Sequence, residues 1–435
     1  MREDRRGEAL RKKNVLPQTE ALMESSLSEY RVLDLTDEKG YFCGKILGDL
    51  GADVIKIERP GGDLGRRIGP FYKNECHPEK NLFWLTYNTS KRGITLNIET
   101  ADGKAIFSEL LRRSDFVIES FPPGYLSRLG LSYEEMRRIN SRLIWVSISP
   151  FGQEGPYSSF KTSDLVSMAM GGLLYITGYP ERPPVRIGVP QSYLLAASHG
   201  AAGALIAHYY RGKSGVGQQV DVSIQEAVTR ALFLEPLFWD IEKFVIRRDG
   251  HYIKRYKLRQ RELWECKDGL VFFRIFGGPT ARRNKGLVEW MKEEEGNAGV
   301  LESVNWDSLN LSGVSQEEYD NSGWEEEIGK FLKKQTGEKI KIEAMKRNII
   351  ALFPCHTCQE ILKDEQLAQR NYWVDIEYPY LGAAIRYPGA FCKMDLTLCR
   401  IGPAPKIGEH NREIYIQELG MSDTEYNTLV QGGIV

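Results

Sequence analysis

Basic side chains that could bind an anion stand beside strand-like runs in the first third of the sequence. Arg59 comes directly after the apolar run "DVIKIE", Lys91 and Arg92 precede "GITLNIE", and Arg128 lies in the turn "PPGYLSRLGL". A guanidinium group offers a planar fork of donors to a phosphate or carboxylate. These places connect strands and helices, which is where doubly wound sheets bind their ligands. The basic residues at these places favour an anionic, nucleotide-like ligand. For Lys91 and Arg92, however, a solvated pair on the protein surface is the commoner explanation.

A second stretch with possible chemistry, residues 186–223, reads "RIGVPQSYLLAASHGAAGALIAHYYRGKSGVGQQVDVS". It predicts a turn, a helix over 193–211, a glycine-rich loop and a strand. Gln191, Ser192 and Tyr193 stand at the start of this helix, and the stretch has no acidic residue before its closing strand. The arrangement is typical of the approach to an active site, but it provides hydroxyl and amide groups and no carboxylate.

The predicted helix over 193–211 also has one face made of small residues. The residues on this face are Ala196, Gly200, Gly203, Ala204 and Ala207. Side chains three and four positions apart lie on the same side of a helix. We therefore expect a neighbouring backbone to approach this face closely.

The sequence "PCHTC" (354–358) contains a single Cys-x-x-Cys pair around His356. A structural zinc ion would need two further ligands at suitable spacing, and none is present, so we interpret the two cysteines as buried thiols. The remaining histidines are scattered, and no Ser-His-Asp or Cys-His set follows from their positions. We expect no metal site.

Short apolar runs alternate with helical patterns from residue 30 onward. Their apolar content is too continuous for half-exposed strands, which predicts strands buried on both faces of a parallel sheet. The capping-box sequence from Ser132 to Glu135 marks one helix start. Gly40, Gly44 and Gly48 do not have the spacing of a dinucleotide-binding loop, so we expect them to let a helix pack closely on the sheet. The predicted strands are 31–35, 53–58, 115–120 and 143–149, and the predicted helices between them are 41–50, 101–113 and 132–140.

The alternation predicts an α/β protein with a Rossmann-like, doubly wound parallel sheet. After the strand "QVDVS" the composition becomes rich in Lys, Arg, Glu and Trp, which indicates a smaller α+β domain, and strand-like runs return near the end. We expect four parts: an N-terminal extension (1–29), the large domain (30–226), a linker and small domain (227–375), and a C-terminal segment that returns to the large domain (376–435).

Length, charge and cysteine content exclude several classes of function. A chain of 435 residues is too long for one hydrophobic core. Its 58 Lys and Arg nearly balance its 59 Asp and Glu, so no basic field predicts nucleic-acid binding. No apolar run approaches the roughly 20 residues of a membrane span, and the charged N-terminus is not a signal peptide. Seven scattered cysteines favour a reducing compartment, and we predict the cytoplasm.

Many ordered segments of this sequence resemble the class III CoA-transferases, the CaiB/BaiF family of formyl-CoA transferase, carnitine CoA-transferase and α-methylacyl-CoA racemase. The segments include "LGDLGADVIKIERPGGD", "NTSKRGITLNIET", "DFVIESFPPGYLSRLGLSYEEMRRINSRLIWVSISPFGQEGPY", "DLVSMAMGGLLYITG" and "APKIGEH". The resemblance is continuous over residues 31–226 and weaker toward the C-terminus. It implies a two-domain subunit in an interlocked dimer, with each chain threaded through the other.

The resemblance also implies that the large domain binds coenzyme A, as an acyl-CoA substrate and not as a tightly bound cofactor. Two departures alter the acyl end of this site. Ser120 stands where relatives have Asn, and the turn from Asp37 to Gly40 is one residue short, with Glu38 or Lys39 near a usual Gln. The positions that correspond to the family's CoA contacts are Arg59, Leu96, Ser120, Phe121, Arg128 and Lys161.

Active transferases of the family use one aspartate, which attacks the thioester and passes through a mixed anhydride and an aspartyl-CoA thioester. The corresponding position here is Tyr193, whose phenol has an ordinary pKa near 10 and is mostly protonated at neutral pH. The racemases of the family use a catalytic histidine, and Ser163 stands at the corresponding position of this sequence. We therefore do not expect racemase chemistry either. Asp164 and Glu181 are the remaining acids nearby, and Asp164 is more typical of a helix cap.

The chain resembles most the two-subunit members of the family that move CoA between succinyl-CoA and an aromatic dicarboxylate such as (R)-benzylsuccinate, in anaerobic toluene degradation. The stretch "PPVRIGVPQSY" contributes to this resemblance. It implies that the chain is the non-catalytic subunit and that its partner is a paralogous subunit bearing the aspartate. The alternative is an acyl-CoA-binding homodimer without transferase activity, in which Tyr193 only packs at the start of its helix.

Overall fold

The computed structural model describes residues 25–255, 258–349 and 351–435. These residues form two compact units. Unit 1 contains the described residues up to 167 together with 190–228 and 370–435, and unit 2 contains 168–189 and 229–369. Residues 168–189 therefore belong to unit 2, although the sequence placed them in the large domain. Most of the expected N-terminal extension lies outside the described residues.

Unit 1 is built on a six-stranded sheet in the order β3-β2-β1-β4-β5-β6. Every neighbouring pair is parallel. The chain winds outward from β1 in both directions, so this is the doubly wound sheet that the sequence predicts. The strands are β1 (Arg31–Leu35), β2 (Asp53–Glu58), β3 (Arg92–Thr95), β4 (Phe116–Glu119), β5 (Ile144–Ser149) and β6 (Gln219–Ser223).

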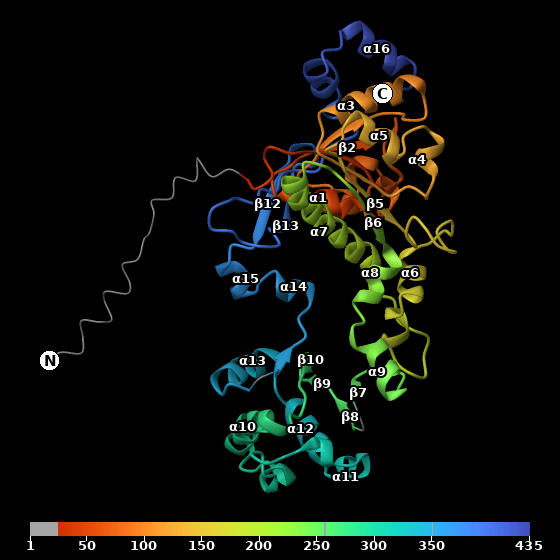
Figure 1. Ribbon diagram of the computed structural model, residues 1–435. Helices are drawn as coiled ribbons and strands as arrows, with labels where there is room; N and C mark the ends of the chain where they lie inside the picture. The colour runs from red at the N-terminus through yellow and green to blue at the C-terminus, as the bar shows by residue number, and fades with distance from the viewer. Residues whose placement is uncertain (1–24, 256–257, 350) are drawn as a thin grey trace, which may run out of the picture. The chain divides into compact units, whose positions relative to one another are not determined.

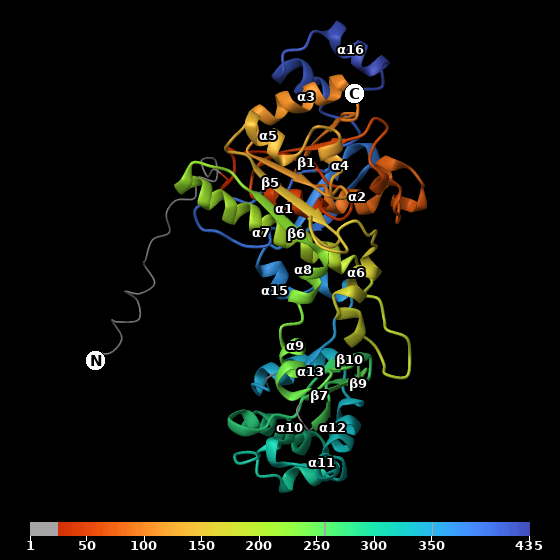
Figure 2. The same cartoon turned by 45° about the vertical axis from the view of Figure 1, so that its right-hand side comes forward.

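Helices cover both faces of this sheet (Figures 1 and 2). One hydrophobic core lies between the sheet and α1 and α7, and the other lies against α3 and α5. The strands are buried on both faces because consecutive residues such as Val32 and Leu33 enter opposite cores. The helices of unit 1 are α1 (Tyr41–Asp49), α2 (Leu82–Tyr87), α3 (Ala101–Arg112), α4 (Tyr125–Arg128), α5 (Tyr133–Ile139), α7 (Gln191–Ser214) and α16 (Asp423–Gln431).

Local sequence signals explain where one of these helices begins and how another packs. Ser132 and Glu135 form the capping box that the sequence predicts at the start of α5. In α1, a Cβ atom at Gly44 would lie 2.3 Å from Asp34 Oδ2 on β1 and 3.1 Å from Ile118 Cδ1 on β4. The expectation that glycines let this helix pack closely on the sheet is therefore confirmed.

The small-residue face of α7 packs against the sheet and α1. Ala196, Gly200, Ala204 and Ala207 are buried. A Cβ atom at Gly200 would lie 3.1 Å from Ile148 Cδ1 and 3.2 Å from Cys43 Sγ. The face is closely packed, but the nearest atoms at Gly200 are side-chain atoms, whereas the sequence predicted those of a neighbouring backbone.

Replacing Ala204 with leucine should therefore overpack this contact and lower the free energy of unfolding by about 1–3 kcal/mol. Urea denaturation measures the effect. Ala202→Leu is the matched control on the exposed side of the same helix, and its effect should stay within about 0.5 kcal/mol. Equal stabilities of the two variants would show that the face is not closely packed.

Unit 2 contains small antiparallel sheets and helices around its own core, which includes Trp264, Trp290 and Phe331. The mixed α+β composition agrees with the prediction for the small domain. One sheet has the order β11-β10-β9, and β7 pairs with β8. The strands are β7 (Tyr252–Arg255), β8 (Leu258–Arg261), β9 (Leu263–Cys266), β10 (Gly269–Phe272) and β11 (Phe353–Pro354), and the helices are α9 (Leu234–Glu242), α10 (Lys285–Glu295), α11 (Gln316–Asn321), α12 (Trp324–Leu332), α13 (Gly337–Lys346), α14 (Cys358–Ile361) and α15 (Glu365–Gln369).

Three further elements complete the chain. Helices α6 (Asp164–Met170) and α8 (Ile224–Arg230) each cross a boundary between the units in sequence. The hairpin of β12 (Trp373–Tyr378) and β13 (Ala383–Pro388) belongs to unit 1 and packs against Tyr41 and Trp84.

The cysteines of the Cys-x-x-Cys sequence correct one expectation. Cys355 and Cys358 are both exposed free thiols, so the interpretation as buried thiols is wrong. Cys355 directly follows β11, and Cys358 is the first residue of the short helix α14.

Candidate functional site

A cavity of about 610 Å³ lies in unit 1 at the carboxyl ends of the sheet strands. Its walls come from the segments that follow β1, β2, β3 and β4. Because β1 and β4 are neighbours from which the chain winds in opposite directions, their following segments diverge and leave a crevice. The lining residues are Leu35, Asp37, Glu38, Ile57, Glu58, Arg59, Pro60, Asp63, Leu64, Ile68, Leu96, Asn97, Ile98, Glu99, Ser120, Phe121, Tyr125 and Gly433.

Four of the six residues predicted to contact CoA line this cavity, and they come from three different strand ends. They are Arg59, Leu96, Ser120 and Phe121. The other two do not line it. Arg128 lies close by, with its guanidinium carbon 6.0 Å from the centre of the Tyr125 ring. Lys161 is exposed and is not part of the wall.

An aromatic pair forms one side of the cavity. The rings of Phe121 and Tyr125 stack with centroids 4.7 Å apart and an interplanar angle of 26°. The Tyr125 hydroxyl donates a hydrogen bond of 2.7 Å to Glu99 Oε1, and burial together with Glu99 raises the pKa of Tyr125 to about 12. With the exposed Arg59 nearby, this wall offers a flat apolar surface and a cation, which suits a nucleotide.

A buried arginine neutralises the carboxylate at the end of β2. Arg66 donates to Glu58 from Nε (2.6 Å) and from a terminal nitrogen (2.8 Å). Its guanidinium carbon stacks 3.7 Å from the centre of the Trp84 ring. Asp63 is also engaged, because it accepts a hydrogen bond from the Gly65 N–H at 2.7 Å and another from the Tyr41 hydroxyl. These contacts hold the turn after β2 that presents Arg59.

The turn after β1 brings two acids to one end of the cavity. Asp37 accepts a hydrogen bond from the Ser120 hydroxyl at 2.7 Å and forms an ion pair with Lys39. Glu38 lines this cavity and also a small one of about 10 Å³ beside Tyr193. Burial, and then the charge of Asp37, raise the pKa of Glu38 above its ordinary value. The family resemblance indicated that this turn is one residue short, but it did not decide whether Glu38 or Lys39 replaces the usual Gln.

Tyr193 lies in the first turn of α7 with only 8% of its surface exposed. The small cavity beside it is lined by Glu38, Phe42, Phe83, Tyr87, Pro190 and Leu194. Burial, and then the charges of Glu38 and Asp37, raise the pKa of Tyr193 further above its ordinary value. The phenol is therefore protonated at neutral pH and is a poor nucleophile.

The two acids considered as alternatives to Tyr193 have other surroundings. Asp164 is buried, and its Oδ1 accepts hydrogen bonds from the Ser192 N–H (3.0 Å) and hydroxyl (2.8 Å). It therefore satisfies a donor in the first turn of α7, whereas the sequence predicted that it caps the helix at whose own start it stands, α6. Glu181 is an exposed residue of unit 2.

The contacts of Lys91 and Arg92 contradict both explanations that the sequence left open, namely phosphate binding and a solvated surface pair. The side chain of Lys91 is fully buried, and its Nζ donates to Asp34 Oδ2 (2.7 Å), the Tyr41 carbonyl (2.8 Å) and Asn88 Oδ1 (2.9 Å). Arg92 is tied to Asp53 at 2.6 Å and also pairs with two glutamates of the C-terminal segment. These side chains hold the sheet and its flanking segments together, and they are neither phosphate ligands nor a solvated pair.

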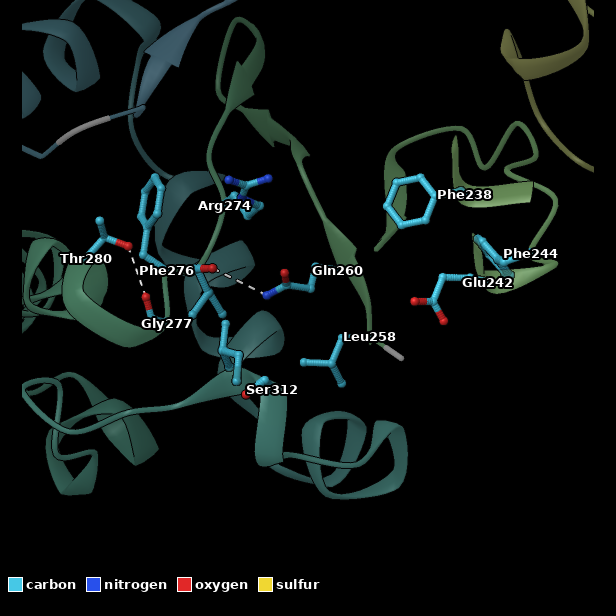
Figure 3. A pocket seen from close by; sticks show the side chains of 12 residues that line it. Phe238, Glu242, Phe244, Leu258, Gln260, Arg274, Phe276, Gly277, Thr280 and Ser312 are labelled. Carbon is cyan, nitrogen blue, oxygen red and sulfur yellow. Dashed lines mark hydrogen bonds between the residues drawn. The ribbon is translucent and has the colours of Figure 1, made fainter. Parts of the chain in front are cut away.

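A second cavity, of about 600 Å³, lies in unit 2 (Figure 3). Phe238 and Phe244 lie on one side of it, and Leu258 and Arg274 lie on the other. Gln260 donates a weak hydrogen bond of 3.4 Å to the Ile275 carbonyl at its edge. None of the predicted site residues lines this cavity.

The described residues contain no group of three or more His, Cys, Asp or Glu side chains placed to hold a metal ion. Among the helices in the described ranges, none has the length and apolar character that crossing a membrane requires.

The structure is a doubly wound α/β protein with a crevice at the carboxyl ends of its strands, and the comparisons identify the family. Residues 27–411 match CoA-transferase family III, and the chain belongs to this family. It is 35% identical over 95% of its length to subunit BbsE of succinyl-CoA:(R)-benzylsuccinate CoA-transferase from Thauera aromatica, and the match covers 99% of that protein.

Two other comparisons agree with this assignment. The chain is 30% identical to the succinyl-CoA–D-citramalate CoA-transferase of Chloroflexus aurantiacus, over 92% of this chain and 95% of that protein. Its fold is similar to the crystal structure of a CaiB/BaiF family protein from Brucella suis, with a TM-score of 0.74, 23% identity, and coverage of 91% of this chain and 99% of that one. The family and the α/β fold with its doubly wound parallel sheet are confirmed, and the interlocked dimer stays a prediction.

Proposed function

We propose that this chain is the non-catalytic subunit of a two-subunit CoA-transferase that moves CoA between succinyl-CoA and a carboxylic acid such as (R)-benzylsuccinate. The observation that carries the proposal is the buried, protonated phenol of Tyr193 at the position where the family resemblance places the attacking aspartate. The similarity to a benzylsuccinate CoA-transferase subunit supports the substrate class.

Covalent CoA transfer requires a carboxylate nucleophile. Attack of a carboxylate oxygen on the thioester carbonyl forms a mixed anhydride and releases CoA thiolate, which then attacks the enzyme's carbonyl carbon, forms an enzyme thioester and releases the donor carboxylate, succinate. The acceptor carboxylate attacks this thioester and forms a second anhydride with release of CoA thiolate, which takes the acceptor acyl group and frees the enzyme carboxylate. A phenol would form an aryl ester instead, and the pKa of Tyr193 keeps it protonated. Asp164 accepts the hydrogen bonds of Ser192, so it is not free to attack. The carboxylate therefore comes from an Asp-bearing paralogous subunit.

The cavity of unit 1 is the proposed CoA site. Arg59 and Arg128 supply cations for phosphates, and Phe121 supplies a ring face for the base. Leu96 and Ser120 complete the wall, and Lys161 is proposed as a further contact to the phosphates. CoA serves as a substrate here, and we propose no tightly bound cofactor. An interlocked dimer in the cytoplasm, formed with the paralogous subunit, is part of the same proposal.

The purified chain, incubated with succinyl-CoA and benzylsuccinate, should transfer no CoA by itself, whereas addition of the Asp-bearing subunit should give benzylsuccinyl-CoA. Chromatography of the CoA esters measures transfer. Mass spectrometry of the chain alone after incubation with succinyl-CoA is the accompanying measurement. Substantial transfer by the chain alone, or an acyl or CoA adduct on any of its side chains, would contradict the proposal.

A second candidate is an acyl-CoA-binding homodimer without transferase activity. The observation that favours it is that the lining residues of this cavity, as far as this chain supplies them, all belong to unit 1. Co-purification separates the candidates, because a stoichiometric Asp-bearing subunit supports the first and a homodimer alone supports the second.

A further inference from the structure

The proposed CoA cavity carries an excess of negative charge. Five carboxylate side chains line it, against the single guanidinium of Arg59. The five are Asp37, Glu38, Glu58, Asp63 and Glu99. A site for a polyanionic ligand is expected to favour cations, so the placement of each carboxylate decides which part of the ligand it meets.

Four of these carboxylates have partners that hold them in the wall. Glu58 is bound by the buried Arg66, Glu99 accepts from the Tyr125 hydroxyl, and Asp63 accepts from a backbone N–H and from the Tyr41 hydroxyl. The Asp37 carboxylate is bound by Ser120 and Lys39. Their hydrogen-bonding capacity is used within the protein.

Glu38 differs from the other four. No other residue in the described ranges donates a hydrogen bond to its carboxylate or forms an ion pair with it. The nearby ammonium group of Lys39 is engaged by Asp37. Glu38 therefore presents a carboxyl group that no other described residue binds directly.

The position of Glu38 identifies the part of the ligand that it meets. It forms a wall common to the large cavity and to the small one beside Tyr193. If CoA binds as proposed, its sulfur points toward the Tyr193 position, so the acyl group of a thioester would lie against Glu38. The phosphates would lie toward Arg59 and Arg128, at the other side of the wall.

We propose that Glu38 is a specificity-determining residue that excludes acyl groups ending in a carboxylate from the site of this chain. This inference rests on the proposed CoA site. The second carboxylate of a succinyl thioester lies two methylene groups beyond the reacting carbonyl, which places it beside Glu38 and Asp37. Like charges in a partly buried position oppose binding. Free CoA and thioesters with a neutral acyl group meet no such repulsion.

The consequence for the two-subunit enzyme is a division of ligands between its sites. Both thioesters of the proposed reaction, succinyl-CoA and benzylsuccinyl-CoA, carry a free carboxylate. The site of this chain would reject both and leave them to the subunit that has the nucleophile. Unproductive occupation of the non-catalytic site by the substrate is thereby avoided.

Calorimetric titration of the full-length chain with four ligands tests this inference. The ligands are CoA, propionyl-CoA, succinyl-CoA and the methyl ester of succinyl-CoA, which has the same length but no terminal charge. We expect the first two and the methyl ester to bind with similar affinity and succinyl-CoA to bind at least about tenfold more weakly. The substitution Glu38→Gln should remove this difference between succinyl-CoA and its methyl ester.

Glu99→Gln is the matched control, because Glu99 lines the same cavity but is bound to Tyr125. It should preserve the discrimination against succinyl-CoA. Equal affinities of the wild-type chain for succinyl-CoA and its methyl ester would overturn the inference while leaving the CoA site intact. Failure of all four ligands to bind would overturn the proposed CoA site itself, and the inference with it.

Discussion

Replacing Asp34 with alanine should lower the free energy of unfolding by about 3–5 kcal/mol. Asp34 is completely buried on β1, and its carboxylate lies 2.7 Å from Lys91 Nζ and 3.5 Å from Lys56 Nζ, both of which are also fully buried. It also accepts hydrogen bonds from the N–H and the hydroxyl of Thr36. Its removal would leave two ammonium groups in the protein interior without their counter-charge, which costs far more than an exposed ion pair is worth.

Urea denaturation at neutral pH measures this change. Asp375→Ala is the control, because Asp375 and Arg386 form a bidentate pair whose side chains are 50% and 51% exposed. Its loss should cost no more than about 1 kcal/mol. Similar losses in the two variants would mean that the buried cluster does not stabilise unit 1.

The stabilisation by Asp34 should also depend on pH. Burial alone would raise the pKa of this carboxyl, but the adjacent ammonium groups of Lys56 and Lys91 bring it below its ordinary value. A carboxyl with a lowered pKa in the folded state contributes stability above its unfolded pKa of about 4, and the contribution is lost as pH falls through the folded value. The difference in unfolding free energy between wild type and Asp34→Ala should therefore be full at pH 7 and shrink below about pH 4.

Strands β1, β2, β4 and β5 could be predicted because each is a nearly continuous apolar run. Burial on both faces removes the alternation of polar residues, so 31–35 and 53–58 are recognisable without any alignment, and the structure places β1 and β2 at these same residues. The parallel direction of the strands could be predicted from the helices between them, because two neighbouring parallel strands must be joined by a crossover connection. Helix α7 extends beyond the expected 193–211 because proline and glycine at its ends, not the apolar pattern, set its limits.

The role of a single charged residue could not be predicted in the same way. Lys91 reads as a surface or ligand-binding lysine because its partner, Asp34, is 57 residues away in sequence and is brought close only by the pairing of β1, β2 and β3. The exposure of Cys355 depends equally on what covers a loop, which spacing does not reveal. The proposed role of Glu38 could not be predicted from sequence, because it depends on whether another of the described residues pairs with its carboxyl group, which only three-dimensional packing shows.

The largest contrast in activity should appear when Tyr193 and the partner's aspartate are changed separately in the assembled enzyme. Under the proposed function, Tyr193→Phe should leave the rate of CoA transfer within about twofold. The substitution keeps the ring that packs at the start of α7 and removes only a hydroxyl that takes no part in the reaction. Replacing the nucleophilic aspartate of the paralogous subunit with asparagine should lower the rate by at least about 10³-fold, because removal of an attacking group leaves only binding and orientation.

Steady-state assays of the two purified complexes, with the subunit ratio checked in each, measure this contrast. A loss of the same size in both complexes would assign the hydroxyl of Tyr193 a direct part in the chemistry and would contradict the proposed non-catalytic role. A smaller loss of rate could come from weaker packing of the ring or from a role of the hydroxyl in the reaction. Tyr193→Leu distinguishes these two causes, because it removes the ring as well as the hydroxyl. If Leu reduces assembly or stability while Phe does not, the ring acts through packing, and the carboxylate that attacks the thioester belongs to the other subunit.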